Sequence, residues 1–265
     1  MRVLITNDDG YTSDGLRALA HAFLRNGHEV IVVAPDRNYS AVSHSLTTFN
    51  PLVLNQRLSD GNLFETYAVA GTPADCGKLA LKQILKERRP DLVVSGLNLG
   101  ANLGMHVFYS GTIAGAFEGT LCRIPSVAVS VAGTAHLEDL SRLAVRLIEK
   151  LLRQTPAATW SERLLLYNIN LPGLPVSDVR GVKVVPLSRS ADEEWFELKT
   201  PAPFHLQYWE PRRTNYRHNH NTGGDAADDV SAVRNGYVAV TPLQFDLNCA
   251  DEIQRLASQE LTLDL

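Results

Sequence analysis

The sequence predicts an α/β fold in which helices cover both faces of a parallel sheet. Over the first 130 residues, short apolar runs typical of buried strands alternate with stretches of helical periodicity. Helices placed between strands imply crossover connections, and therefore parallel strands. With 265 residues, of which 45% are hydrophobic, the chain is also long enough to bury a sizeable core.

The first strand–helix–strand unit comes at the start of the chain. Residues 3–6 are a short apolar run, as a buried parallel strand requires. Apolar residues then recur at helical spacing over 16–24, with Ser13 or Asp14 available as the N-cap. Residues 29–34 are a second apolar run and are predicted to be the next buried strand.

Further strands and helices alternate up to about residue 152. Thr72-Pro73 is typical of the N-cap and first position of a helix, which we expect to end near Lys86. The remaining elements predicted in this stretch are a strand at 91–95, a helix at 112–121, a strand at 126–131 and an amphipathic helix at 137–152.

The pattern changes after about residue 155. Residues 188–230 are polar with scattered aromatic residues, which favours an extended hairpin or an oligomer contact over a second core. His218 and His220 fall in this polar stretch, and we interpret them as part of a solvated loop and not as metal ligands. The predicted elements here are strands at 164–169, 182–185 and 237–241 and a short helix at 226–236.

Composition narrows the class of function. The net charge of −4 is mild and gives no basic surface of the kind that binds a nucleic acid polymer. The three cysteines, an odd number and far apart, favour a reducing compartment. No apolar run reaches the roughly 20 residues of a membrane helix, and the charged start of the chain does not look like a signal peptide. We therefore expect a cytoplasmic protein that does not contact a membrane.

The most informative polar residues directly follow the first strand. Ligands of open α/β sheets bind outside the carboxyl ends of the strands, and here the residues after the strand at 3–6 are Asn7-Asp8-Asp9-Gly10. Two adjacent carboxylates repel a phosphate unless a cation lies between them. Hard oxygen ligands of this kind suit Mg²⁺ or Mn²⁺. The alternative is that Asp8 and Asp9 only shape a turn and cap a helix.

A second polar strand end follows the strand predicted at 91–95. Residues 96–104 form a loop rich in glycine and asparagine, and Ser110-Gly111-Thr112 then opens a helix. Backbone N–H groups and two hydroxyls at such a helix start form a candidate anion cradle. The alternative is a capped helix after a flexible loop. A cation site beside an anion cradle fits a phosphoryl group held between them.

Three other nucleotide or nucleophile motifs are absent. Five residues lie between Gly71 and Gly77, where a nucleotide P-loop needs four, and Leu79 follows the lysine in place of Ser or Thr. No Gly-x-Ser-x-Gly nucleophile elbow occurs. An NAD-binding enzyme is disfavoured because the glycine fingerprint is missing.

In order and separation, the motifs resemble those of the SurE family, the survival-protein nucleotidases. The segments that carry the resemblance are 3–10, 34–40 with 43–47, 71–76, 95–104, 109–112 and 236–243. The resemblance implies one divalent cation per subunit, Mg²⁺ or Mn²⁺, bound by Asp8, Asp9, Ser40 and Asn98. It also implies hydrolysis of nucleoside 5′- and 3′-monophosphates and, in some members, of short polyphosphate.

The family resemblance implies an architecture as well. A Rossmann-like core at 1–187 would carry the active site, within a single domain of 1–265. A β-rich extension at 188–265 would be exchanged between subunits, giving a homodimer or homotetramer. His106 departs from the family, because an acidic residue is frequent at this position, and the loss of a negative charge there could alter substrate preference.

The roles of individual residues are a hypothesis about the mechanism. Asn102 and the Ser110-Gly111-Thr112 turn would bind the phosphate oxygens of the substrate. Asp8 or Asp9 would also act as general base or as nucleophile, and the sequence leaves these two roles open. The competing interpretations are another metal-dependent phosphohydrolase and a non-catalytic module that senses nucleotide or metal.

Overall fold

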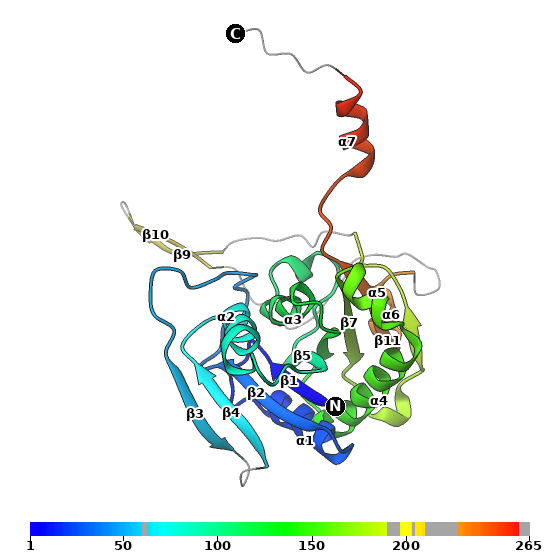
Figure 1. Cartoon of the computed structure of the whole chain (residues 1–265). Helices are drawn as coiled ribbons and strands as arrows, with labels where there is room; N and C mark the ends of the chain where they lie inside the picture. Colours follow the sequence, from blue (N-terminus) through cyan, green and yellow to red (C-terminus); the bar gives the residue numbers. More distant parts are fainter. Residues whose placement is uncertain (60–62, 190–196, 203–204, 210–226, 260–265) are drawn as a thin grey trace.

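The computed structural model describes residues 1–59, 63–189, 197–202, 205–209 and 227–259. The predicted fold class is confirmed: helices cover both faces of a mixed, mainly parallel nine-stranded sheet (Figure 1). In spatial order the strands are β3 (Leu54–Ser59), β4 (Phe64–Val69), β2 (Glu29–Pro35), β1 (Arg2–Thr6), β5 (Leu92–Leu99), β6 (Ser126–Ala132), β7 (Leu165–Pro172), β11 (Val238–Gln244) and β8 (Val182–Val184).

The centre of this sheet is parallel and its edges are not. Strands β4, β2, β1, β5, β6 and β7 pair in parallel, whereas β3 runs antiparallel to β4 and β11 antiparallel to β7. Chain order runs outward from β1 in both directions, through β2 on one side and β5 on the other. The point where the strand order reverses therefore lies at β1, which is the usual position of a ligand site in such sheets.

Two helical layers sandwich the sheet. Helices α1 (Asp14–Arg25) and α4 (Leu137–Gln154) pack on one face, and α2 (Pro73–Leu79) and α3 (Gly111–Leu121) pack on the other. The remaining helical segments are π-helical η2 (Ala80–Ile84), 3-10 helices η3 (Gly104–Phe108) and η4 (Val176–Asp178), and helices α5 (Ala157–Glu162), α6 (Asp229–Arg234) and α7 (Ala250–Ala257).

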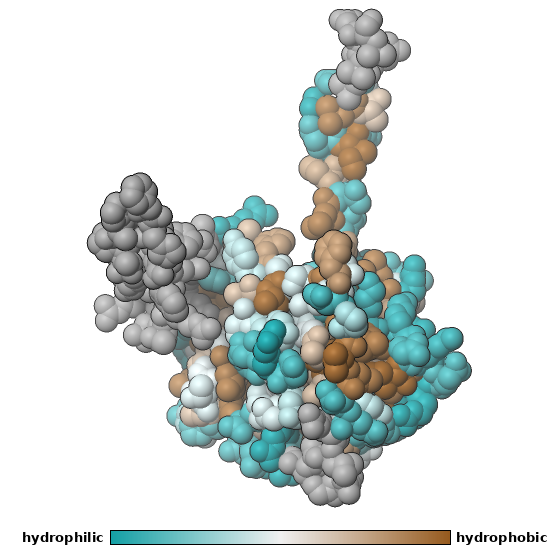
Figure 2. Space-filling view, turned by 90° about the vertical axis from the view of Figure 1, so that its left-hand side faces the viewer, coloured by the Kyte–Doolittle hydropathy of each residue, from teal (hydrophilic) through white to brown (hydrophobic). Residues whose placement is uncertain are grey.

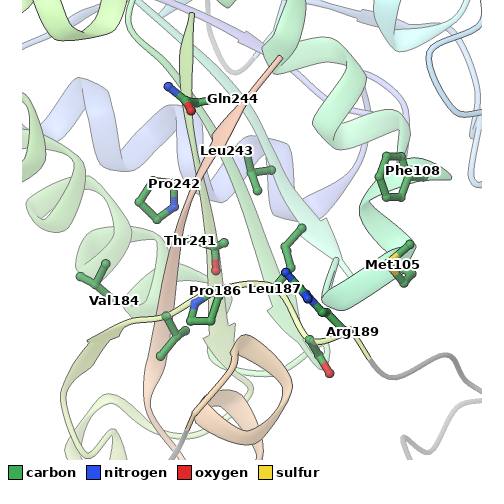
Figure 3. Close-up of a pocket in the computed structure, with 12 residues that line it drawn as sticks. Met105, Phe108, Val184, Pro186, Leu187, Arg189, Thr241, Pro242, Leu243 and Gln244 are labelled. Carbon is green, nitrogen blue, oxygen red and sulfur yellow. The ribbon is translucent and has the colours of Figure 1, made fainter. Parts of the chain in front are cut away.

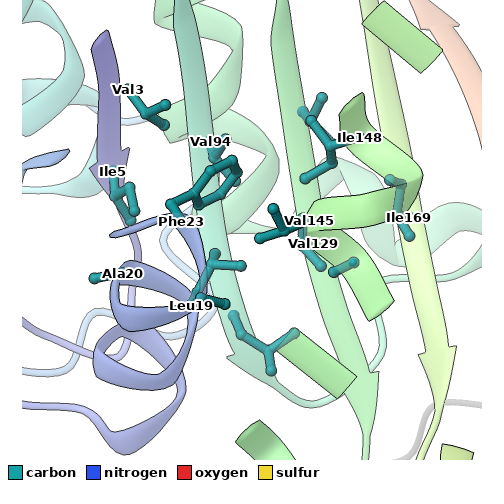
Figure 4. Packing of buried hydrophobic residues seen from close by; sticks show 14 of the residues in the cluster. Val3, Ile5, Leu19, Ala20, Phe23, Val94, Val129, Val145, Ile148 and Ile169 are labelled. Carbon is teal, nitrogen blue, oxygen red and sulfur yellow. The ribbon is translucent and has the colours of Figure 1, made fainter. Parts of the chain in front are cut away.

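Alternating side chains of β1 supply both cores. Val3 and Ile5 pack toward α1, and Leu4 packs toward α2, as expected for a strand whose neighbouring residues face opposite sides of the sheet. Figure 4 shows Phe23 of α1 directed at the strands, with Val145 of α4 beside it. Full burial on both faces explains why these strands are continuous apolar runs in the sequence.

The predicted helix starts are confirmed by their capping contacts. The Ser13 hydroxyl accepts a hydrogen bond from the Leu16 amide at 3.3 Å, which caps α1. Thr72 caps α2 in a capping box with Asp75, with Pro73 in the first turn. The helix expected over 72–86 is thus present, but it changes from α-helical to π-helical geometry at Ala80.

Several elements differ from the sequence prediction. Strands β3 and β4, α5 and α7 were not predicted, because short or exposed segments give weak periodicity. Strand β5 continues to Leu99, whereas 96–104 was expected to be a loop; β6 continues alongside, and pairs with β5 at Asn98 and Leu99. Strand β11, from the predicted extension, pairs with β7 inside the main sheet.

Helix α3 lies unusually close to the sheet because small residues face the strands. A Cβ placed on Gly119 would lie 2.6 Å from Cγ2 of Val93 in β5. We expect Gly119→Ala to lower the free energy of unfolding by about 1–3 kcal/mol through overpacking. Helix propensity alone predicts a gain of about 1 kcal/mol for the same change. Urea unfolding distinguishes the two effects, because overpacking lowers the free energy of unfolding and helix propensity raises it. A Gly119→Ala variant more stable than wild type would contradict the close approach of α3 to β5.

Two parts of the described chain, the strand pair of β9 (Glu197–Ala202) and β10 (His205–Trp209) and helix α7, stand apart from the body (Figure 1). Strands β9 and β10 form a separate antiparallel hairpin, in the region where an extended hairpin was expected. His218 and His220 lie outside the described residues. Helix α7 projects from the body (Figure 1), and brown, apolar residues lie on the surface of this projection (Figure 2). Ile253 of α7 is 54% exposed. Among the described residues, no helix is long and apolar enough to cross a membrane.

Candidate metal and phosphate site

The predicted site residues gather at the carboxyl ends of β1, β2 and β5. Asp8 and Asp9 follow β1, Ser40 lies in the connection that leaves β2, and Asn98 lies in β5 itself. Thr6 at the end of β1 pairs with Ser95 of β5, so β5 extends beyond β1 and carries Asn98 past its end. The site therefore lies at the point where the strand order reverses.

Asp8 is a buried carboxylate held by the start of α3. It is 5% exposed, and its Oδ1 accepts a hydrogen bond of 2.7 Å from the Thr112 hydroxyl. Burial raises the pKa of Asp8 from its ordinary 3.8 to about 6; the hydroxyl and backbone amide of Thr112 oppose the rise, and the charge of Asp9 adds to it. The protein therefore keeps an ionised carboxylate here at an energetic cost, which a bound cation would relieve.

Asp9 is more accessible and is fixed by two donors. Its Oδ2 accepts from the Leu99 amide of β5, and its Oδ1 accepts from the Asn38 side chain, both at 3.2 Å. Burial raises the pKa of Asp9 as well, against the lowering effect of these two hydrogen bonds. Leu99 directly follows Asn98 in β5, so this hydrogen bond joins Asp9 to the residue beside Asn98.

Asn38 links Asp9 to Ser40, and the sequence analysis gave it no role. Its side-chain NH₂ donates to Asp9, while its Oδ1 accepts from the Ser40 amide at 2.9 Å and from the Ser40 hydroxyl at 2.7 Å. The acceptance from a backbone amide two residues later is an Asx turn, so an Asn at this spacing after a strand was a readable signal. The structure thus brings Ser40 to Asp9 through one side chain.

Asn98 lies in β5, one residue before the Leu99 amide that donates to Asp9. Its side-chain NH₂ donates to the Gly100 carbonyl at 2.5 Å, which leaves Oδ1 as the atom available to a cation. The main-chain connection from β1 is also fixed, because the Tyr39 amide donates to the Asp8 carbonyl at 2.7 Å. Hydrogen bonds thus link Asp9 and Ser40 through Asn38 and hold Asp8 to Thr112 and Tyr39, while Asn98 directly precedes Leu99, the donor to Asp9.

The predicted phosphate cradle already makes contacts within the protein. The Ser110 hydroxyl accepts from the Ile113 amide at 3.1 Å and so caps α3, and Thr112 donates to Asp8. A Cβ on Gly111 would lie only 2.9 Å from Cβ of Asp8, so glycine permits this close approach of the helix. The first turn of α3 thus supports Asp8 directly, and its contact with phosphate stays a prediction.

Asn102 is buried in an amide network behind the site. Its side-chain NH₂ donates to the Ser130 hydroxyl at 2.8 Å, and its amide donates to Asn170 Oδ1 at 2.8 Å. Its carbonyl accepts from Asn168 at 2.8 Å and from Asn170 at 3.0 Å. These contacts fix the loop after β5, and the expected contact between Asn102 and phosphate is not tested by them. His106 lies half-buried in η3.

The donor set fits a hard divalent cation. The candidate ligand atoms are carboxylate, hydroxyl and amide oxygens, which Mg²⁺ and Mn²⁺ prefer. Within the described part of the chain, neither Asp8 nor Asp9 pairs with a Lys, Arg or His side chain. The same residues contain no group of three or more His, Cys, Asp or Glu suited to a metal. A cation site here therefore depends on the amide and hydroxyl oxygens as well as the two carboxylates.

The hydrogen bond between Thr112 and Asp8 provides a test of this arrangement. We expect Thr112→Val to weaken Mn²⁺ binding about tenfold, because a hydrogen bond to a charged group is lost. Thr120→Val is the matched control: it lies on the same helix, and its buried hydroxyl has no hydrogen-bond partner among the described residues. Titration calorimetry with Mn²⁺ at neutral pH compares them, and equal weakening in both variants would contradict the assigned role.

A pocket of about 690 Å³ lies elsewhere on the molecule. Met105 and Phe108 of η3 line one side of this pocket. Leu243, near the end of β11, and Leu187 line the side that faces them (Figure 3). Its lining is mainly apolar and includes none of the predicted metal ligands. The chemistry of the carboxylates, and not this pocket, locates the candidate site.

Comparison with known proteins finds a family and relatives that span most of the chain. The family described as "Survival protein SurE" matches residues 3–194 of this chain. A protein of Vibrio cholerae named 5′-nucleotidase SurE is 38% identical over 257 residues, covering 97% of this chain and 96% of its own. A protein of Symbiobacterium thermophilum with the same name is 40% identical over 268 residues, covering 98% of each chain.

A solved structure is similar along the whole chain. The crystal structure of the SurE protein from Aquifex aeolicus has a TM-score of 0.79 to this structure at 37% sequence identity. The match covers 97% of this chain and 99% of the Aquifex chain. The two proteins therefore share the same fold.

Proposed function

The chain belongs to the SurE family, and on that premise we propose that it is a phosphatase that hydrolyses nucleoside 5′-monophosphates to nucleoside and phosphate. The observation that carries the proposal is the pair of carboxylates, Asp8 and Asp9, at the point where the strand order reverses. A donor from α3 holds Asp8, and donors from β5 and from the connection after β2 hold Asp9. The names of the relatives support hydrolysis of a nucleotide as the reaction class. The two carboxylates supply oxygen ligands for a catalytic cation.

The proposed cofactor is one Mg²⁺ or Mn²⁺ per subunit, held by Asp8, Asp9, Ser40 and Asn98. When bound, such a cation neutralises charge on the phosphoryl group and polarises the phosphorus atom. The two carboxylates would otherwise repel a phosphate dianion, so the substrate and the cation are expected to bind in the same place.

The protein contributes positioning and proton transfer. Asn38 and the Leu99 amide fix both oxygens of Asp9, the more accessible carboxylate, which suits it to orient and deprotonate an attacking water. Thr112 holds Asp8 from the opposite side. The N-terminal end of α3 favours negative charge, so we place the remaining phosphate oxygens beside Gly111, with Asn102 and Ser110 nearby in the chain.

The proposal extends to related phosphate esters and to assembly. Activity on 3′-monophosphates and on short polyphosphate is proposed from the family resemblance.

A homodimer or homotetramer is supported by α7, which buries none of its residues against the rest of the described chain. Phe245 and Leu247 before it are also exposed, and a second subunit would cover these apolar side chains.

Phosphate release from a panel of nucleoside 5′- and 3′-monophosphates tests the reaction class. Each substrate is assayed with Mn²⁺, with Mg²⁺ and with EDTA. We expect release that either cation supports and EDTA abolishes. Absence of release with every substrate and both cations, in protein shown to be folded by circular dichroism, would refute the proposal and favour a non-catalytic nucleotide- or metal-sensing module.

A further inference from the structure

The connection from β2 to β3, residues 36–53, begins at the candidate site and has to hold Ser40 in place. Ser40 is exposed, and its amide and hydroxyl both donate to Asn38 in the same connection. The residues before Ser40 are attached to the aspartates, because the Asn38 side chain donates to Asp9 and the Tyr39 amide donates to the Asp8 carbonyl. The residues after Ser40 are held by a separate set of contacts, farther along the connection.

The connection carries backbone strain directly after Ser40. Ala41 has a φ of 59° and Ser43 a φ of 55°, both in the left-handed region that non-glycine residues seldom adopt. Such conformations are unfavourable and persist only where surrounding contacts enforce them. The contacts that enforce this conformation therefore also hold the residues that directly follow Ser40.

Hydrogen bonds join the connection to the helical layer on the α2–α3 face. The Ser43 hydroxyl donates to the Phe108 carbonyl at 2.6 Å, and the Ser43 amide donates to the Tyr109 carbonyl at 3.0 Å. Farther along, the Thr47 amide donates to the Asp75 carboxylate at 3.0 Å. Between these two attachments lies His44.

His44 bonds to a buried carboxylate that the catalytic proposal does not use. Its Nε2 lies 2.7 Å from Oε1 of Glu118, and the Glu118 side chain is only 7% exposed. No Lys or Arg of the described chain pairs with Glu118, so His44 is the partner that compensates its burial. The His44 ring also stacks on Phe117, with ring centroids 6.4 Å apart.

Glu118 lies on the same helix that supports Asp8. Helix α3 holds Asp8 through Thr112 near its start and holds the Ser40 connection through Glu118 further along. A single rigid helix therefore sets the position of two proposed ligands that lie on different loops. We propose that His44 is a positioning residue, which through Glu118 fixes the strained connection carrying Ser40 relative to the carboxylates of the cation site.

This inference rests on the cation site of the proposed function, and its test does not depend on turnover. Mn²⁺ dissociation constants are measured by the electron paramagnetic resonance signal of free Mn²⁺ for wild type, His44→Ala and His44→Gln. Loss of residues that orient metal ligands weakens binding about 10–100-fold, so we expect at least a tenfold increase for His44→Ala. His44→Gln keeps a side-chain donor, and we expect it to restore most of the affinity.

His28→Ala is the matched control. His28 makes an equivalent bond, with its Nε2 2.9 Å from Oε1 of Glu149, but it lies before β2 at the opposite edge of the sheet. We expect this variant to lose stability without a change in Mn²⁺ affinity. A similar loss of affinity in His28→Ala and His44→Ala would assign the effect to general destabilisation and overturn the inference.

A second measurement uses metal-free protein. Arg37 is exposed within the connection, so tryptic cleavage after Arg37, followed by mass spectrometry, reports how firmly the connection is held. We expect faster cleavage in His44→Ala than in wild type or His28→Ala. If wild type binds no Mn²⁺, the proposed cofactor is wrong, and the cleavage rates still decide whether His44 holds the connection. Unchanged cleavage in His44→Ala would overturn the inference.

Discussion

Asp9→Asn is expected to abolish nearly all cation-dependent phosphate release while leaving the protein folded. The substitution removes one of two carboxylates from the proposed cation site. An asparagine also cannot accept hydrogen bonds on both sides, as Asp9 does from Asn38 and from the Leu99 amide, because its NH₂ group is a donor. Changes to residues that merely orient a metal ligand cost about 10–100-fold, so loss of a ligand should cost at least about 100-fold.

The matched control for this variant is Asp14→Asn. Asp14 is an exposed carboxylate in the first turn of α1, and its replacement by asparagine changes the net charge by the same amount as Asp9→Asn. Rates of phosphate release with saturating Mn²⁺ and Mg²⁺ are compared for the two variants and wild type. Asp9→Asn that retained more than a tenth of the wild-type rate would exclude Asp9 from the proposed role.

Asp8→Asn is expected to stabilise the metal-free protein and to inactivate it. Burial raises the pKa of Asp8 in the folded protein to about 6, against an ordinary 3.8. Between these two values the folded state binds more protons than the unfolded state, so stability falls as the pH rises through this window. At pH 7 the ionised carboxylate then costs about 2–3 kcal/mol, which a neutral asparagine removes.

Urea unfolding of both proteins in EDTA measures this difference. Asp8→Asn should be the more stable protein at pH 7, and the two should converge as the pH falls below 4, where Asp8 is protonated in either state. With cation at about 100 times its dissociation constant, wild type should gain about 2.7 kcal/mol and the variant should not. A metal-free variant less stable than wild type at pH 7 would show that Asp8 contributes to folding and is not held at a cost.

The candidate site shows how far local patterns reach. Asn-Asp-Asp-Gly after the first strand identified both carboxylates, because a buried parallel strand makes a recognisable apolar run and the sheet places its end at the ligand edge. Asn38 was missed although its turn with Ser40 is local. Its other contact, to Asp9, joins residues 29 positions apart and depends on β1 and β2 being neighbours.

The phosphate cradle illustrates the opposite case. The sequence placed Ser110 and Thr112 at a helix start correctly, since capping is a local interaction. It could not show that the Thr112 hydroxyl bonds to Asp8, 104 positions away, or that Asn102 is enclosed by Ser130, Asn168 and Asn170. Those partners are set by the packing of α3 and the order of strands β5, β6 and β7.

The sequence by itself determined the α/β class, the central strands and helices, the helix caps and the identity of the two carboxylates. Each depends on periodicity or on contacts within a few residues. The tertiary structure alone decided the pairing of β3 and β4, the extension of β5 to Leu99, the return of β11 to the sheet and the bond between His44 and Glu118. These features depend on which distant segments become neighbours, and a hydrogen bond between distant residues leaves no periodic trace in the chain.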